Sequence, residues 1–314
     1  MGGHLASPNT IKLSSAGACA RLDYAVSAMQ GWRETMEDAH ICAIDIAPET
    51  CLFAVLDGHG GKEISTFVSR HLTEELLKNR HFAAEEFELA LYETFLHMDS
   101  LMTKAEGLQE LYKIQQDIPD CYSVSASALK EMENKAGSTA CVALLHRNSL
   151  YVANAGDSRC VLARGGHALD MSTDHKTSVS TESARVKRAG GTVYLGRVNG
   201  QLALTRSMGD FSYKSNPLAP ADEQIITAKP DVKVEKLTPK DQFLILGCDG
   251  IWDVLSSQEC VDYVNKHLRA GTELRTLCEE LCDYCLVERR GRQGSSDNMT
   301  VIVVRLQVSA VDEE

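Results

Sequence analysis

Aspartates at the ends of apolar, strand-like runs are the first chemical feature of this sequence. Asp57 closes the run in VLDGHGG, Asp157 follows ANAG and Asp249 follows ILGC, while Asp297 stands in mirror image just before MTVIVV. Strand ends converge on one rim of a sheet, so carboxylates placed there can meet in space. Gathered like charges repel unless cations neutralise them, and hard oxygen ligands suit magnesium or manganese. One Asp-Gly pair is usually a turn, but four strand-end aspartates, with Asp253 as a fifth, predict a metal site.

The residues around these aspartates fit phosphoryl chemistry. A pair of divalent cations lowers the pKa of a bridging water and holds a phosphate in line for attack. The segment GWRETMEDAH offers Arg33, whose planar fork grips phosphate, and Glu37 and Asp38 as outer metal ligands. His59 stands two residues after Asp57 and can supply a proton at physiological pH. Taken singly, His59 is more often a turn residue and Arg33 a surface ion pair, but their place among the carboxylates favours catalysis.

Strand-like runs and amphipathic helices alternate along the chain and must position these residues. Apolar residues recur at helical spacing in some segments and form short β-like runs in others. Ser256 and Glu259 make a capping box that predicts the start of one helix. Strands at both ends and in the middle, without a repeat or a linker, predict one α+β domain with helices outside its sheets. Helices are expected at 62–79, about 84–104, 183–188, 256–268 and about 273–287, and strands within 24–56 and at 139–145, 150–155, 160–163, 242–246 and 300–306.

Seven ordered motifs resemble the metal-dependent serine/threonine protein phosphatases, the PPM or type 2C family. They are RETMEDAH, VLDGHGG, GSTACVALL, VANAGDSRCVL, ALTRSMGDFSYK, GCDGIWDVLS and SSDNMTVIVV, and they cover about Tyr24 to Leu306. The resemblance implies a central β-sandwich of two antiparallel sheets flanked by helices, with the metals in a channel at one end. It also implies hydrolysis of phosphoserine and phosphothreonine in phosphorylated protein substrates, by metal-activated water at a binuclear Mn²⁺ or Mg²⁺ centre.

The resemblance assigns a role to each metal-binding candidate. Asp57 is expected to bridge two cations, and the backbone carbonyl of Gly58 to bind one of them. Asp249 and Asp297 would then complete the coordination of the first cation. A third, weaker metal position of the family is matched by Asp157 together with Asp249 and Asp253.

The resemblance also assigns roles to residues expected near the second cation and near the substrate phosphate. Glu37 and Asp38 are expected to act on the second cation through waters. Arg33 would hold the substrate phosphate, and His59 would be the general acid. Asp210 of SMGD is interpreted as structural and left out of the site.

Several segments lie outside the catalytic motifs. The small, polar N-terminus is interpreted as a flexible arm, residues 107–135 as a surface insertion, and residues 165–191 as a segment similar to the family's flap. Thr177 stands in that segment where the family commonly has proline, which predicts a looser turn beside the channel. The expected boundaries are 1–22 for the arm, 23–308 for the phosphatase domain and 309–314 for a C-terminal tail.

Composition limits the partners and the compartment. The 44 acids against 32 bases, a net charge of -12, exclude nucleic acid as the main partner, because that binding depends on Lys and Arg. Without a secretory signal or a bilayer-spanning run, we expect a soluble monomer of the cytoplasm or nucleus with no stable membrane insertion. Most of the eleven cysteines lie in apolar runs, and Cys278, Cys282 and Cys285 share a helical face with leucines, which favours core packing over zinc.

Two other functions and one modification are compatible with parts of the sequence. A catalytically inactive pseudophosphatase acting as a binding module would lack a metal aspartate or the phosphate arginine, and none is missing. A hydrolase of nucleotides or small phosphate esters would share the chemistry but not the extended match to protein phosphatases. Gly2 of MGGHLAS is an imperfect N-myristoylation site, because Ala6 occupies the position that favours Ser or Thr. If acylated, one such chain would add only weak, reversible membrane association.

Overall fold

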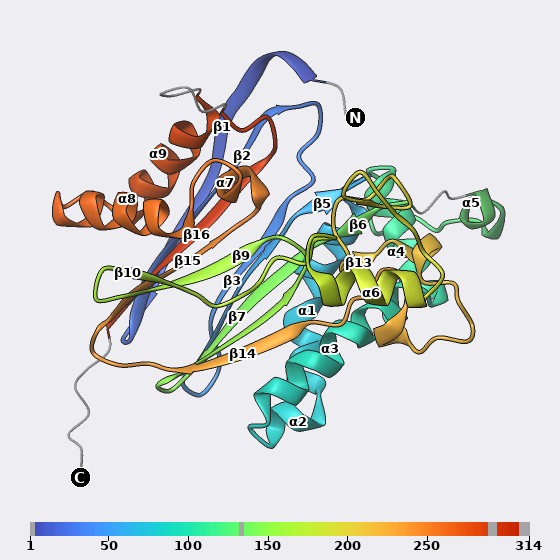
Figure 1. Ribbon diagram of the computed structural model, residues 1–314, viewed down its shortest axis with the longest axis horizontal. Helices are drawn as coiled ribbons and strands as arrows, with labels where there is room; N and C mark the ends of the chain where they lie inside the picture. The colour runs from blue at the N-terminus through green and yellow to red at the C-terminus, as the bar shows by residue number, and fades with distance from the viewer. Residues whose placement is uncertain (1–3, 132–134, 288–293, 308–314) are drawn as a thin grey trace.

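The computed structural model describes residues 4–131, 135–287 and 294–307, and it consists of two antiparallel sheets packed face to face (Figure 1). This confirms the predicted α+β sandwich. In spatial order, the six-stranded sheet contains β1 (His4–Cys19), β2 (Leu22–Arg33), β16 (Met299–Leu306), β15 (Asp241–Gly247), β9 (Arg159–Arg164) and β10 (His167–Asp170). The five-stranded sheet contains β14 (Asp231–Lys236), β8 (Ser149–Ala155), β7 (Ala140–His146), β4 (Thr50–Leu56) and β3 (Ala39–Ala47).

Strand β4 shows why the sandwich has helices on its outside. Its sequence TCLFAVL is apolar on both faces, and every residue of it is buried. Cys51, Phe53 and Val55 pack between the two sheets, while the alternate residues Leu52 and Ala54 pack against helices. Side chains alternate across a strand, so a continuous apolar run requires a cover on each face.

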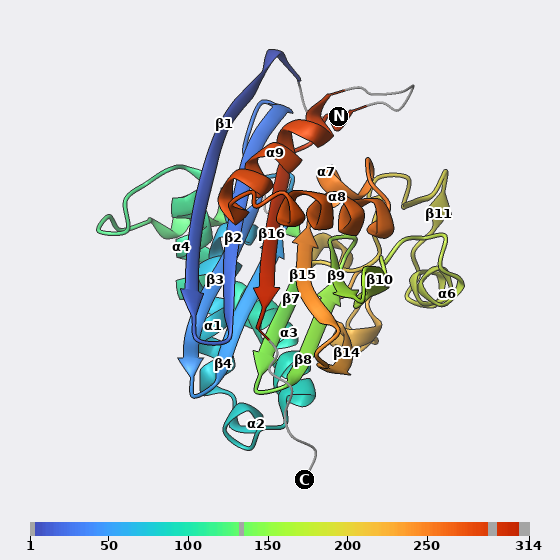
Figure 2. The same cartoon turned by 90° about the vertical axis from the view of Figure 1, so that its left-hand side faces the viewer.

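Helices supply that cover on both sides, giving four layers (Figures 1 and 2). α1 (Glu63–Lys78) and α3 (Phe87–Met102) cover the five-stranded sheet, and α8 (Ser257–Arg269) and α9 (Leu274–Leu286) cover the six-stranded sheet. Fully burying each large apolar side chain contributes about 1.5–3 kcal/mol to folding. The predicted capping box of Ser256 and Glu259 starts α8. The three cysteines of α9 are buried in its apolar core, so their assignment to packing is confirmed.

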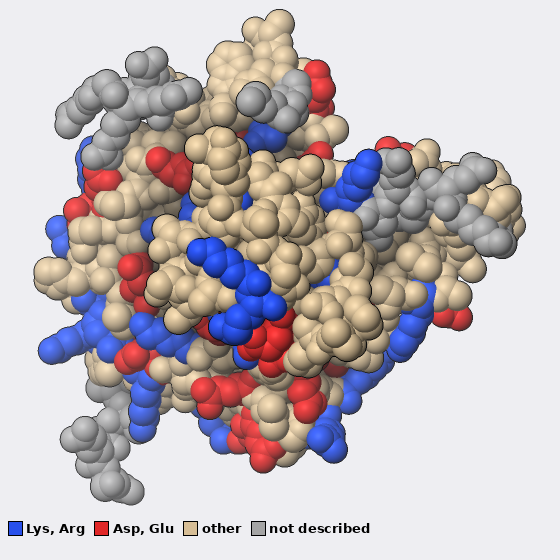
Figure 3. Space-filling model, turned by 45° about the vertical axis from the view of Figure 1, so that its right-hand side comes forward, with Lys and Arg blue, Asp and Glu red and all other residues tan. Residues whose placement is uncertain are grey.

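The remaining elements are short. They are α2 (Arg80–Ala83), α4 (Ala105–Gln115), α5 (Ala126–Glu131), α6 (Ser180–Arg188), α7 (Asp249–Trp252), β5 (Gly58–His59), β6 (Gly137–Ser138), β11 (Val193–Tyr194), β12 (Arg197–Val198), β13 (Met208–Gly209) and the 3-10 turns Phe211–Tyr213 and Ala221–Glu223. Within the described ranges, every helix is too short or too polar to span a lipid bilayer. Acidic and basic side chains are interspersed on the face drawn in Figure 3.

The predicted flexible arm is wrong for the described part of the N-terminus. Residues 4–19 form β1, which pairs antiparallel with β2 at the edge of the six-stranded sheet. The segment lacks a strong apolar pattern because an edge strand is held chiefly by backbone hydrogen bonds to one neighbour, and it tolerates Pro8 for the same reason. Lys12 of β1 also forms an ion pair of 2.7 Å with Asp283 of α9. Gly2, the acylation candidate, lies outside the described residues.

The segment 107–135 is only partly a surface insertion. Its first residues belong to α4, which packs against α1. Leu111 and Ile114 of α4 are buried in the apolar core between the five-stranded sheet and its covering helices. Two apolar residues three positions apart in a polar context are a weak helical pattern, which is why the sequence alone did not reveal this contribution. Thr177, for which a looser turn is predicted, donates from its hydroxyl a 2.6 Å hydrogen bond to the carbonyl of Gly196, a contact that a proline could not make.

Candidate metal centre

One end of the sandwich holds a cleft of about 720 Å³ into which the predicted site residues converge. Strands β4 and β15, from the two facing sheets, both end here, and β16, the antiparallel neighbour of β15, begins here, so Asp57, Asp249 and Asp297 meet although they are far apart in sequence. The cleft is lined by every predicted site residue except Asp38: Arg33, Glu37, Asp57, Gly58, His59, Asp157, Asp249, Asp253 and Asp297. Asp38 lies behind it, with ligand atoms of Asp38, Asp57 and Cys248 within 4.8 Å of one another.

The carboxylates are held in an environment that opposes their charge. Burial and then the neighbouring Asp249 and Asp38 raise the pKa of Asp57 well above its ordinary value. Burial, followed by Asp157 and Asp297, does the same to the pKa of Asp249. Burial raises the pKa of Asp38 to about 7, although a hydrogen bond from Thr300 opposes the shift. Such a cluster needs either protons or cations, and its oxygen donors fit divalent Mg²⁺ or Mn²⁺.

Hydrogen bonds orient the acidic loop after β2. Thr300 of β16 donates from its hydroxyl to Asp38 at 2.7 Å, and the amide of Glu37 donates to the side-chain oxygen of Asn298 at 2.9 Å. A side chain at Gly58 would collide with the carbonyl of Glu37, so this close approach requires glycine. The absence of a side chain at Gly58 therefore lets the backbone next to Asp57 lie close to the backbone of Glu37.

Thr139 links two of the segments that carry predicted metal ligands. Its hydroxyl accepts the amide of Asp57 at 3.1 Å and bonds the hydroxyl of Ser158 at 2.7 Å. The adjoining Asp157 is buried, and burial raises its pKa, while the ammonium of Lys176, 3.4 Å away, opposes that shift. Thr139 therefore fixes the backbone of Asp57 relative to Ser158, the residue that follows Asp157.

Arg33 combines one protein contact with an unused donor. Its Nη2 donates to the carboxylate of Asp297, while its Nε is buried without a partner among the described residues. A buried donor without an acceptor is costly, so it is suited to a ligand that supplies one. The side chain is 38% exposed, which leaves its guanidinium accessible from the cleft.

Asp210, assigned a purely structural role from the sequence, contacts a predicted catalytic residue. His59 Nε2 lies 2.7 Å from Asp210 Oδ2, which also accepts the hydroxyl of Ser207 at 2.6 Å. β5 and β13 bring the two residues together by pairing with opposite edges of β6, and a side chain at Gly137 would overlap both groups. Burial would lower the pKa of His59, but the carboxylate of Asp210 outweighs it and raises the pKa.

Residues on the flap side of the cleft were not predicted from the sequence. Lys176 lies within the predicted flap-like segment, but Arg197 and residues 202–204 lie beyond its expected end at 191 and line the same cleft. No spacing rule indicated them, because they come from short elements and loops around β12 rather than from a periodic strand or helix. The signal for Asp210 was its place in the motif ALTRSMGDFSYK, and Lys176 stood only within the flap-like segment.

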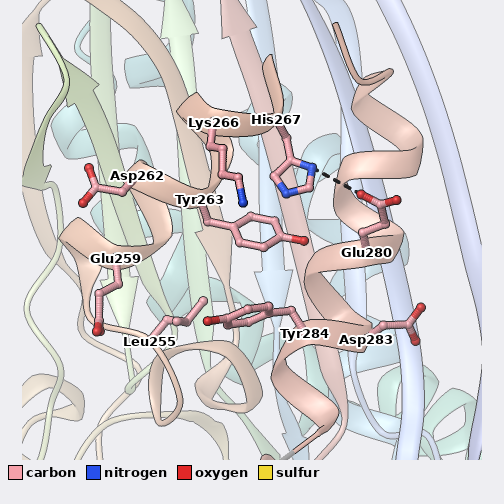
Figure 4. A pocket seen from close by; sticks show the side chains of 9 residues that line it. All are labelled: Leu255, Glu259, Asp262, Tyr263, Lys266, His267, Glu280, Asp283 and Tyr284. Carbon is pink, nitrogen blue, oxygen red and sulfur yellow. Dashed lines mark ion pairs between the residues drawn. The ribbon is translucent and has the colours of Figure 1, made fainter. Parts of the chain in front are cut away.

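A second hollow lies between α8 and α9, away from these carboxylates (Figure 4). Tyr263 and Tyr284 face each other across it with ring centroids 5.1 Å apart, and His267 pairs with Glu280 at 3.2 Å. It contains none of the strand-end aspartates, so it lacks the carboxylates on which the predicted phosphoryl chemistry depends.

Comparison with known proteins agrees with this geometry. Residues 22–299 match the family model described as Protein phosphatase 2C. The chain is 45% identical to "Probable protein phosphatase 2C 3" of Paramecium tetraurelia over 98% of this chain and 100% of that one, and 38% identical to "Probable protein phosphatase 2C 21" of Arabidopsis thaliana over 98% and 93%. The solved structure of a phosphatase from Toxoplasma gondii shares the fold, with a TM-score of 0.74 at 23% identity over 96% of this chain and 98% of that one. The chain belongs to the protein phosphatase 2C family of metal-dependent serine/threonine phosphatases.

Proposed function

We propose that the cleft binds two divalent cations, Mn²⁺ or Mg²⁺, and uses them to hydrolyse phosphoserine and phosphothreonine in proteins. The observation that carries this proposal is the convergence of buried and half-buried aspartates from distant strand ends, with the pKa values of Asp57 and Asp249 raised, beside Arg33 and His59. Asp57 and the carbonyl of Gly58 would hold the cations with Asp249, Asp297, Glu37 and Asp38, and a third, weaker position would involve Asp157 and Asp253. Bound there, the cations would make water a nucleophile near neutral pH and neutralise the phosphoryl oxygens.

The protein side chains then have distinct tasks around the phosphate. Arg33 would bind phosphoryl oxygens with the part of its guanidinium that is accessible from the cleft, fixing the phosphorus at the rim of the carboxylate cluster. His59 would donate a proton to the seryl or threonyl oxygen as it departs. Asp210 accepts a hydrogen bond from His59 Nε2, which fixes the ring's orientation and favours its protonated form.

Chelation tests the metal requirement directly. Exhaustive treatment with a divalent-cation chelator is expected to abolish phosphopeptide hydrolysis, because the proposed nucleophile is a water that only bound cations activate near neutral pH. Added Mn²⁺ or Mg²⁺ should restore turnover, measured as released phosphate. Full turnover in the chelated protein would contradict the proposal, and inactivity with every cation would favour the inactive binding module instead.

His59→Gln separates the proton donor from the metal ligands. A seryl alkoxide must be protonated as it leaves, whereas nitrophenolate is a stable leaving group. The variant is therefore expected to lose about 100-fold in turnover of a phosphopeptide and much less with nitrophenyl phosphate. Equal losses on the two substrates would show that His59 is not the acid.

We also propose that the phosphatase acts as a monomer in the cytoplasm or nucleus, on phosphorylated proteins. A net charge of -12 disfavours self-association. All eleven cysteines are free, which suits a reducing compartment.

A further inference from the structure

Two cysteines and an aspartate gather at the end of the sandwich opposite the metal centre. Ligand atoms of Cys19, Asp45 and Cys51 all lie within 4.8 Å of one another. Cys51 is buried, Cys19 is half-buried and Asp45 is exposed. The catalytic cleft is at the other end of β4, about 20 Å away along the six residues that separate Cys51 from Asp57.

The three residues come from different strands and from both sheets. Cys19 is the last residue of β1, in the six-stranded sheet, while Asp45 lies in β3 and Cys51 in β4, in the five-stranded sheet. The β1–β2 and β3–β4 turns lie at the same end of the sandwich in Figures 1 and 2. The β3–β4 register shifts between Ala43 and Ala47, and Asp45 has φ +57° there. Such an irregularity can re-aim a side chain that regular pairing would direct elsewhere.

The ligand set differs in chemistry from the catalytic centre. Thiolates are soft ligands that favour zinc, which is usually tetrahedral, whereas the carboxylates and carbonyl of the cleft favour Mg²⁺ or Mn²⁺. Two sulfurs and one carboxylate oxygen leave one position of a tetrahedron for water, and the exposed Asp45 provides access from solvent. Burial raises the pKa of the Cys51 thiol, so the free thiol keeps its proton at neutral pH, and a bound cation would displace that proton.

The nearby positive charge is compatible with such a site. Arg21 donates to the backbone carbonyls of Arg147 and Glu49, and its charge favours the thiolate form of Cys51. Two thiolates and a carboxylate carry three negative charges, so one Zn²⁺ leaves a net negative charge that Arg21 balances.

We propose that Cys19, Asp45 and Cys51 bind one zinc ion that ties the edge strand β1 to the five-stranded sheet. Binding forms two zinc–sulfur bonds and one zinc–oxygen bond and releases the two thiol protons to solvent. No sulfur is oxidised or reduced. The site would stabilise the end of the sandwich remote from catalysis, where β1 is otherwise an edge strand held by one neighbour.

Cadmium titration of the full, reduced chain tests this proposal. Cadmium is a spectroscopic substitute for zinc, because its thiolate complexes absorb in the ultraviolet by charge transfer, and saturating Mg²⁺ would occupy the carboxylate centre. We expect one equivalent of Cd²⁺ to produce this absorption and Zn²⁺ to remove it by displacement. Binding should also release protons and raise the thermal unfolding midpoint by a few degrees.

Variants identify the ligands. Cys19→Ser should abolish the absorption, and Asp45→Asn should weaken cadmium binding at least about tenfold. Cys121→Ser, an exposed cysteine elsewhere, and Cys248→Ser, beside the catalytic aspartates, should retain it. Denaturant unfolding of each variant without metal verifies that it folds.

Three results would overturn the proposal. One is the absence of thiolate absorption in reduced wild-type protein. Another is undiminished absorption in Cys19→Ser. The third is a Cys19–Cys51 disulfide, found by peptide mass mapping after air exposure, in a chain that binds no cadmium when reduced.

Discussion

Asp57→Asn is expected to reduce phosphatase turnover by about 1000-fold or more, because loss of even an outer partner of a metal ligand costs about 10–100-fold. Asp57 lies at the centre of the carboxylate cluster, near Asp38, Asp249 and Cys248. A neutral amide binds divalent cations more weakly and cannot bridge two of them as a carboxylate does. Asp249→Asn should act in the same direction. Turnover is measured on a phosphopeptide at saturating Mn²⁺.

The same variant has an opposite effect on the metal-free fold. The folded protein raises the pKa of Asp57, so its ionised form destabilises the metal-free state at neutral pH. In chelator, Asp57→Asn should therefore unfold at a temperature equal to or above that of wild type. Asp120→Asn, the same change at an exposed carboxylate, controls for the substitution itself. Wild-type turnover of Asp57→Asn at saturating metal would disprove the site assignment.

Glu182→Gln is expected to lower the free energy of unfolding by about 3 kcal/mol, the usual scale for removing one partner of a buried ion pair. Glu182, on α6, is buried and accepts hydrogen bonds from Arg185 at 2.7 Å, from Arg206 at 2.7 and 3.1 Å, and from Thr205 at 2.6 Å. The amide would leave the buried guanidinium of Arg185 without its counter-charge, and Arg206 would keep only its 2.7 Å ion pair with Asp231. Denaturant unfolding at pH 7 measures the difference.

A matched control is a second glutamate that pairs with an arginine of α6. Glu223 pairs with Arg188 at 2.9 Å, but both side chains are largely exposed. Glu223→Gln should therefore change stability by no more than about 0.5 kcal/mol. Equal losses in the free energy of unfolding for the two substitutions would show that burial does not determine how much the Glu182 cluster stabilises the protein.

The Glu182 effect should depend on pH in a defined direction. Burial alone would raise the pKa of Glu182, but hydrogen bonds from Arg206 and the charge of Arg185 outweigh it and lower the pKa from 4.5 to about 2. A lowered folded-state pKa stabilises the protein above the unfolded-state value. The difference between wild type and Glu182→Gln should stay constant down to about pH 4.5 and shrink as the pH falls towards about 2. A difference that is unchanged at pH 3 would contradict this account.

Much of the sandwich could be predicted from local pattern. Burial could be predicted for the apolar run of β4 and for the apolar faces of α1 and α3, because the exposure of each side chain follows the period of its element. The capping box likewise predicted where α8 begins. The strand-end aspartates were predicted for the same reason. The position of a strand's end can be read from local sequence, and several strands end at the same edge of a sheet.

Only the tertiary structure decided which polar residues meet across long separations. His59 and Asp210 are 151 positions apart, and their contact depends on the pairing of three two-residue strands that carry no apolar pattern. β1 is fixed by its register with β2, and the Cys19–Asp45–Cys51 cluster by the way two turns from different sheets come together. Sequence periodicity predicts whether a residue is buried. Which residue it contacts is set by sheet register and by the packing of the two sheets, and both depend on the whole chain.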